Sequence, residues 1–152
     1  MMITGVHDHK LCAAVALFLF FSLFGAACTR QQKYAAPTIV GSAVVVEVSS
    51  LQPETPRFFT YQYNNKNINF FVLRMDTGVQ SYLDACASCY PHKLGYKCED
   101  GSVSCRACGL KFSVHKLEKG LGGCYPIRIE GRMENGRYLI PLASLEAEAE
   151  KF

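Results

Sequence analysis

Four cysteines form two Cys-x-x-Cys pairs, Cys86/Cys89 and Cys105/Cys108, separated by fifteen residues. Two thiolates three residues apart on a tight turn can reach one ion, and two such turns supply the four sulfurs of a tetrahedral site. Gly109 directly follows Cys108 and can adopt a positive φ, so that backbone N–H groups point at the sulfurs. The spacing alone favours zinc, and the same thiolates suit an iron–sulfur cluster or Cu(I).

A fifth thiol, Cys124, follows Gly122 and Gly123, which let the backbone approach a neighbour closely. It is an additional or alternate metal ligand, or a buried cysteine at a bulged strand start. Six cysteines follow Cys28, and an even number in an exported protein is also typical of a disulfide framework. A c-type haem is excluded, because neither Cys-x-x-Cys pair is followed by His. The sequence assigns no role to Cys98.

The first 28 residues have the layout of an export signal. Lys10 precedes an uncharged apolar run, residues 11–27, which ends in small residues. The run is also just long enough to span a bilayer if it is not cleaved. The stretch "LFGAAC" resembles a bacterial lipobox with Cys28 as the lipid attachment site. We therefore expect residues 30–152 to be extracytoplasmic and membrane-associated, on the periplasmic side.

The rest of the chain reads as a short tether, residues 29–38, followed by one β domain, residues 39–152. The segments 57–63 and 68–74 are aromatic and β-branched, and the turn residues "NNKN" between them predict a hairpin. Asn135-Gly136 predicts a second hairpin.

The closing residues "ASLEAEAEKF" predict one short helix with Ser144 as its N-cap. The expected fold is thus mainly β, built from hairpins. A Cys-rich metal-binding segment with two knuckles, residues 84–126, is inserted in it, and a short helix lies at the C-terminal end.

Composition excludes some functions. The net charge of +3 is small and dispersed, which argues against nucleic acid as a partner. No Ser/His/Asp set or carboxylate pair stands in a suggestive context, so we do not expect a hydrolase, and the sequence favours a protein that is not an enzyme. His92 and His115 follow the thiol pairs in sequence, but packed or solvated side chains are the favoured interpretation of both.

Three stretches, "LDACASCYPHKLGY", "VSCRACGLKF" and "GGCYPIRIE", together resemble the membrane iron–sulfur protein family called FtrD-like. The likeness covers nearly all of residues 45–152 and departs from the family pattern at Tyr125, where Asn is common. Longer members carry several membrane spans, so this chain resembles their soluble domain. The matching residues, in chain order, are Asp84, Cys86, Cys89, Lys93, Gly95, Tyr96, Cys105, Cys108, Gly109, Phe112, Gly122, Gly123, Cys124 and Pro126.

The resemblance implies an iron–sulfur protein associated with bacterial iron uptake, which handles electrons or iron beside membrane-embedded transporter or permease components. The ligands that it implies are Cys86, Cys89, Cys105 and Cys108, with Cys124 additional or alternate. Two other interpretations stay open at this point: a structural zinc knuckle that acts as a binding module, and a disulfide-stabilised secreted thiol protein.

Overall fold

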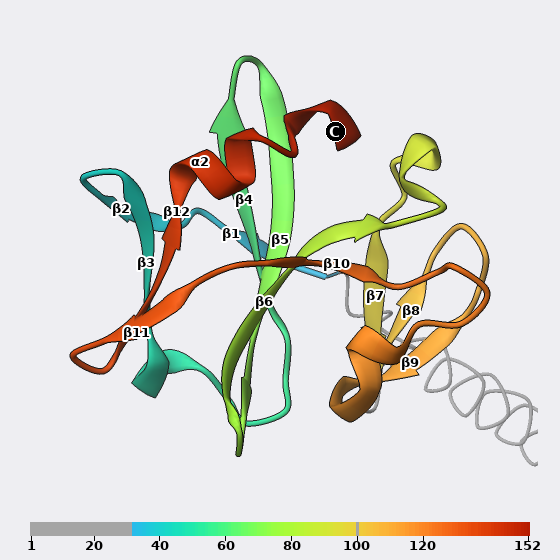
Figure 1. Ribbon diagram of the computed structural model, residues 1–152, viewed down its shortest axis with the longest axis horizontal. Coiled ribbons are helices and arrows are strands. Elements are labelled where there is room, and N and C mark those ends of the chain that lie inside the picture. The colour runs from blue at the N-terminus through green and yellow to red at the C-terminus, as the bar shows by residue number, and fades with distance from the viewer. Residues whose placement is uncertain (1–31, 100) are drawn as a thin grey trace, which may run out of the picture. The chain divides into compact units, whose positions relative to one another are not determined.

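The computed structural model describes residues 32–99 and 101–152 and is mainly β, with three sheets (Figure 1). The predicted leader, with the lipid attachment site at Cys28, lies outside the described residues. None of the described helices is long and apolar enough to cross a membrane.

The largest sheet has five strands in the order β1-β4-β5-β6-β10. Its centre is the predicted hairpin, in which β4 and β5 are antiparallel and are joined at Asn64 and Asn65, both with positive φ. The strands are β1 (Tyr34–Ala35), β4 (Arg57–Tyr63), β5 (Lys66–Met75), β6 (Gly78–Cys86) and β10 (Pro126–Ile129).

The second sheet has four strands in the order β11-β12-β3-β2, and the third has three in the order β7-β8-β9. The hairpin predicted at Asn135-Gly136 joins β11 to β12, and both turn residues have positive φ. The strands of the second sheet are β2 (Thr38–Val40), β3 (Ala43–Glu47), β11 (Arg132–Glu134) and β12 (Arg137–Pro141). Those of the third are β7 (Tyr96–Glu99), β8 (Ser102–Cys105) and β9 (Lys111–Ser113).

The aromatic strands β4, β5 and β6 form a layer that is buried on both faces. Successive side chains of a strand point to opposite faces, so Phe70 and its partner Leu83 face the first core, whereas Phe71 and Tyr82 face the second. The first core includes buried residues of β3 and β12, such as Val44 and Ile140. The second includes residues of the three-stranded sheet and the buried cysteines Cys86, Cys105 and Cys124. The buried cysteines therefore pack in the same core as the side chains on one face of the central sheet.

The structure corrects two local predictions. Part of the expected tether is built into the fold, because Tyr34 and Ala35 pair in parallel with Phe58 and Phe59. The C-terminal helix α2 (Leu142–Glu146) is preceded by Pro141 and has no side-chain cap, so Ser144 lies inside it rather than at its N-cap. A 3-10 turn, Ala149–Lys151, follows.

Candidate metal centre

The first Cys-x-x-Cys pair lies where β6 ends. Cys86 is the last residue of the strand, and the backbone N–H of Cys89 donates to the Cys86 carbonyl at 3.1 Å. A 3-10 turn, Tyr90–His92, begins directly after Cys89, with Pro91 inside it. The strand end and the tight turn thus bring both side chains to the same edge of the sheet.

The second pair lies at the end of β8. Cys105 is the last residue of the strand, and the N–H of Gly109 donates to its carbonyl at 2.9 Å. Gly109 has a φ of +74°, as its position after the second cysteine suggests. The chain then returns through Leu110, whose carbonyl accepts from the N–H of Cys105 at 2.9 Å. This closed turn presents Cys108 at the surface.

A third turn contributes Cys124. The backbone groups of Leu121 and Cys124 bond each other in both directions, at 2.9 and 3.0 Å, across Gly122 and Gly123, whose φ values are +58° and +80°. The hydroxyl of Ser88 donates to the Gly123 carbonyl at 2.8 Å and ties this turn to the first pair. The glycine pair noted in the sequence therefore lets a distant segment close over the thiols.

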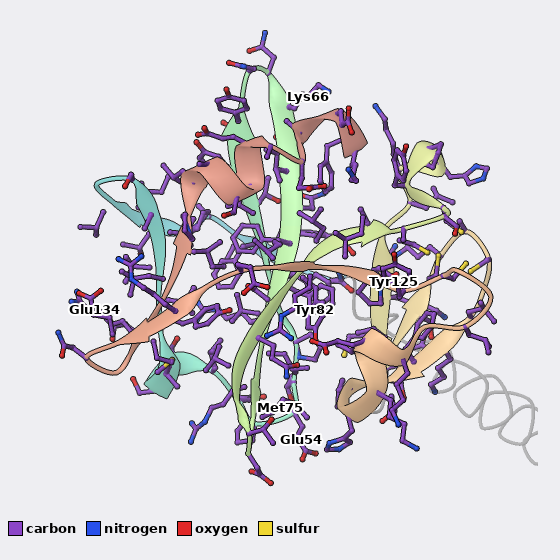
Figure 2. All side chains as sticks on the ribbon, in the orientation of Figure 1. Glu54, Lys66, Met75, Tyr82, Tyr125 and Glu134 are labelled. Atoms are coloured by element: carbon purple, nitrogen blue, oxygen red, sulfur yellow. The ribbon has the colours of Figure 1, made fainter. Side chains whose placement is uncertain are left out.

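These three turns bring all five predicted ligand residues together. The sulfurs of Cys86, Cys89 and Cys124 lie within 4.8 Å of one another, and so do those of Cys89, Cys105 and Cys108. Cys89 belongs to both triads, and its sulfur is therefore within this distance of the other four clustered sulfurs. The Cys124 sulfur is 3.8 Å from both Cys89 and Cys108. Figure 2 shows sulfur atoms gathered beside Tyr125.

The sulfur separations have a chemical meaning. Two thiolates bound to one tetrahedral ion at about 2.3 Å are about 3.8 Å apart. None of the five thiols forms a disulfide. Cys86, Cys105 and Cys124 are buried, Cys89 is half-buried and Cys108 is exposed. The donor set fits a soft metal ion or an iron–sulfur cluster in number and in kind, since both are held by Cys thiolates.

The surroundings make two thiols easier to ionise. Burial opposes ionisation of Cys86, but the backbone N–H of Ser88, with the Tyr96 hydroxyl, outweighs it and lowers the pKa of Cys86 to about 7. The backbone N–H of Leu110 is the main cause that lowers the pKa of Cys108. Both effects favour the thiolate, which is the form that binds metal.

The other three thiols have raised pKa values, so they are harder to ionise. Burial raises the pKa of Cys89 and of Cys124, and the neighbouring thiols raise it further. Burial likewise raises the pKa of Cys105. Five thiolates this close repel one another, so the arrangement needs a cation to ionise fully.

Asp84 supports the site from the same face of β6 as Cys86. Its buried carboxylate accepts from the Tyr34 hydroxyl and from the Tyr96 N–H, both at 2.6 Å. Burial raises the pKa of Asp84 to about 6. Gly95 packs directly on this carboxylate. The Asp84 carboxylate thus connects three strands: β6, to which it belongs, β1 through Tyr34, and the start of β7 through Tyr96.

Tyr96 is the other buried support. It is fully buried, stands opposite Cys105 in the β7–β8 pair, and packs edge-on against Phe71 and Phe112. Its hydroxyl makes no hydrogen bond of ordinary geometry within residues 32–99 and 101–152. Burial raises the pKa of Tyr96, and the nearby Cys86 thiol raises it further. A buried hydroxyl with only sulfur to bond is consistent with a ligand set that is anionic when occupied.

A small cavity of about 100 Å³ opens beside the thiols. Cys86, Cys89 and Cys105 line it, with Cys86 and Cys105 themselves almost fully buried, whereas Cys108 is exposed at the surface. The other residues that line it are Tyr34, Asn69, Asp84, Ala85, Tyr90, Lys93, Leu94, Gly95, Ala107, Lys151 and Phe152.

Cys98, His92 and His115, the other metal-binding residue types considered in the sequence, are not members of the two thiol triads. Cys98 is on β7, opposite Val103, and belongs to neither thiol triad. His115 faces Glu54 at 3.5 Å, and His92 is exposed in the 3-10 turn. Sequence reasoning missed the support from Tyr34, because nothing in the "QQKYAAPT" stretch signals a contact to a residue fifty positions away.

Fold and site together define a mainly β protein with a cluster of cysteines that could bind metal. The family model described as "Membrane iron-sulfur containing protein FtrD-like" matches residues 33–152, and the chain belongs to this family. The resemblance seen in the sequence is thereby confirmed. The match covers all of the described residues except Gln32, including the five clustered thiols.

No curated protein matches the chain. One solved structure is similar, a protein named as a nitrite reductase NADPH small-subunit oxidoreductase. It is 12% identical, covers 66% of this chain and 98% of its own, and has a TM-score of 0.39. A similarity of this size does not establish a shared fold.

Proposed function

We propose that this chain is an exported, membrane-tethered iron–sulfur or metal-binding protein that passes electrons or iron to a bacterial iron-uptake system. The observation that carries the proposal is the convergence of five thiols from three separate turns in a chain of the FtrD-like family. Its partners would be membrane-embedded iron transporter or permease components, and no catalytic residue is assigned.

The centre would be held by Cys86, Cys89, Cys105 and Cys108, with Cys124 as an additional or alternate ligand. A bound iron–sulfur cluster supplies one-electron transfer. The chain's own contribution is to keep the thiols buried on the side of the second core and accessible at Cys108. An electron carrier needs such an exposed edge, because transfer requires close approach of a partner.

The first test is to purify the full chain without oxygen and to record its visible absorption spectrum together with elemental analysis. Iron with inorganic sulfide, and a broad absorption that bleaches on reduction, would support the proposal. A colourless protein with zinc alone would contradict the electron-transfer role. Copper in place of iron, bound in the reduced state, would show a Cu(I)–thiolate centre instead.

A structural zinc knuckle is the second candidate function, and the sulfur separations favour it. The 3.8 Å spacings of Cys124 from Cys89 and Cys108 equal those expected for thiolates on one tetrahedral ion. A protein of this kind would be a binding module with a closed, redox-silent site. Electrochemistry of the purified protein separates the two functions, since only an iron–sulfur centre titrates at accessible potentials.

Export and tethering are tested separately from the metal. We propose that residues 1–28 direct export and that Cys28 receives the lipid. Metabolic labelling with a radioactive fatty acid, followed by fractionation, should find label in the membrane fraction and lose it in the Cys28→Ser variant. Label retained in that variant would contradict lipidation at Cys28.

A further inference from the structure

The three thiol-bearing turns are tied into one continuous rim. The N–H of Ala87 donates to the Tyr125 carbonyl at 3.0 Å, which joins the first turn to the third. The N–H of Arg106 donates to the Gly95 carbonyl at 3.0 Å, which joins the second turn to the loop that follows the first. We call residues 87–95, 106–111 and 119–125 the thiol rim. It is a structural unit around the cysteines rather than three independent loops.

The thiol rim exposes large apolar side chains. Leu94, Leu121 and Tyr125 are 53%, 61% and 43% exposed, and each belongs to one of the segments that surround the thiols. Tyr125 is labelled in Figure 2, where it lies beside the sulfur atoms. Cys108 is exposed among them. These three side chains lie on segments that surround the accessible ligand, so a partner that approaches Cys108 meets apolar side chains as well as charged ones.

The same rim is basic. Lys93, Arg106, Lys111 and Lys119 are all exposed, and none of them forms an ion pair with an acidic side chain of the described residues. Of the acidic groups nearby, Glu118 pairs with Arg128 and Glu99 with Lys97, and the charge of Arg106 acts on the buried carboxylate of Asp84. The three segments of the thiol rim contain these four cations and no acidic residue, so they present positive charge to an approaching molecule.

From this combination we propose that the thiol rim is the docking face for a partner protein with an acidic surface, which exchanges one electron with the metal centre. This inference rests on the proposed electron-transfer function and adds the place and the charge of the contact. Three apolar side chains around an exposed ligand suit the small, transient contact of electron-transfer partners. They are few for insertion into lipid, which uses a whole apolar helix face.

The test measures electron transfer from the anaerobically reduced full-length protein to two probes of opposite charge. Plastocyanin, an acidic blue-copper protein, accepts one electron at Cu(II), and cytochrome c, a basic haem protein, accepts one at Fe(III). We expect a faster reaction with plastocyanin at low salt that slows as salt increases, since screening removes the attraction. Equal rates and no salt dependence would overturn the proposal.

Charge-reversal variants locate the effect. Lys93→Glu/Lys119→Glu should slow the reaction with plastocyanin about tenfold at low salt and accelerate that with cytochrome c. The matched control Arg74→Glu/Arg132→Glu changes the net charge equally on β5 and β11, away from the thiols, beside Met75 and Glu134 as labelled in Figure 2. An equal effect of both pairs would show only net charge and would overturn the assignment to the rim.

A binding measurement separates the two proposals. Anisotropy of dye-labelled plastocyanin should report complex formation that the rim variant weakens, whether or not the centre is redox-active. Binding without electron transfer would keep the docking face and reject the electron-transfer function. If the rim variant instead loses binding only to vesicles of phosphatidylcholine and phosphatidylglycerol, the rim is a membrane-contact surface and the protein partner is rejected.

Discussion

The carboxylate of Asp84 occupies the space that a side chain on Gly95 would need. A Cβ built at Gly95 would stand 2.5 Å from Oδ2 of Asp84, and Gly95 itself has a φ of +65°. The next residue, Tyr96, donates its N–H to the same carboxylate at 2.6 Å. Because Gly95 has no side chain, β7 can begin directly against the buried carboxylate of Asp84. Asp84 itself lies two residues before the first thiol, Cys86.

This contact predicts that Gly95→Ala is more destabilising than strain at a positive φ alone. Gly101 provides the matched control, because its φ is +67° and nothing lies within 4 Å of its added Cβ. We expect Gly101→Ala to cost about 1 kcal/mol and Gly95→Ala about 2–3 kcal/mol, since the latter also displaces Asp84. Urea unfolding of both variants measures the difference. Equal losses would mean that the backbone, not the Asp84 contact, demands glycine.

Tyr96 and Tyr82 form a second matched pair. Both are buried and both pack against Phe71, but the Tyr82 hydroxyl bonds Gln80 at 2.9 Å, whereas that of Tyr96 faces Cys86. A hydrogen bond to a ligand thiolate stabilises the more negative, reduced state of a centre. We therefore expect Tyr96→Phe to lower the reduction potential and Tyr82→Phe to leave it unchanged.

A readout with cobalt keeps this prediction independent of the native metal. In the Co(II)-substituted protein, loss of the Tyr96 hydroxyl should move the sulfur-to-cobalt charge-transfer absorption to longer wavelength, while the Tyr82→Phe spectrum stays in place. Tyr96→Phe should also leave stability nearly unchanged, because its hydroxyl has no ordinary partner, whereas Tyr82→Phe should lose about 1 kcal/mol. Identical spectra for all three proteins would exclude a bond from Tyr96 to a ligand.

The position of Cys89 predicts unequal roles among the five thiols. Its sulfur is in both triads, whereas that of Cys124 is in one. Cys89→Ser should therefore lose most of the bound metal, and Cys124→Ser should retain metal at affinity lowered by about 10–100-fold. Metal content of protein purified without oxygen, followed by competition with a chelator, measures both. Cys98→Ser is the control and should bind metal as the unaltered protein does; stronger loss in Cys124→Ser than in Cys89→Ser would contradict the assignment.

Local sequence patterns predicted the β elements well and their long-range contacts poorly. The hairpin turns at Asn64 and Asn135 follow from residues that tolerate a positive φ, which is a local property. The thiol spacing likewise predicted two tight turns. Neither pattern contains the pairing of Tyr34 with Phe58, because that contact depends on which sheet edge is left open after β4 and β5 pair.

The residues of the candidate site were likewise predictable where a local pattern identifies them and not where a long-range contact does. The four thiols of the Cys-x-x-Cys pairs could be proposed from spacing, but only the fold shows that Cys124 reaches them, since its turn is held by the Ser88 hydroxyl and the Gly123 carbonyl. The helix cap predicted at Ser144 was wrong, because Pro141 already fixes the start of α2 and no side-chain cap is used. Cap residues are preferences that tertiary context overrides.

Two separate cores predict what happens when the metal is removed. Among the described residues, the core between the five- and four-stranded sheets contains no thiol, whereas the second core includes Cys86, Cys105 and Cys124. Without a cation, ionised thiols repel one another, and this repulsion acts where the three-stranded sheet meets the central layer, at Cys86 on β6 and Cys105 on β8. A chelator should therefore loosen β7, β8 and β9 and leave β3, β4, β5 and β12 folded.

Hydrogen exchange followed by mass spectrometry measures this difference directly. Peptides that cover residues 96–113 should exchange at least tenfold faster after chelation, whereas peptides that cover residues 43–47 and 68–74 should keep their protection, because the free energy of local opening falls only where metal contributes. Cys105→Ser should show the same pattern without a chelator. Uniform loss of protection along the domain would mean that metal binding and the folding of both cores are a single cooperative step.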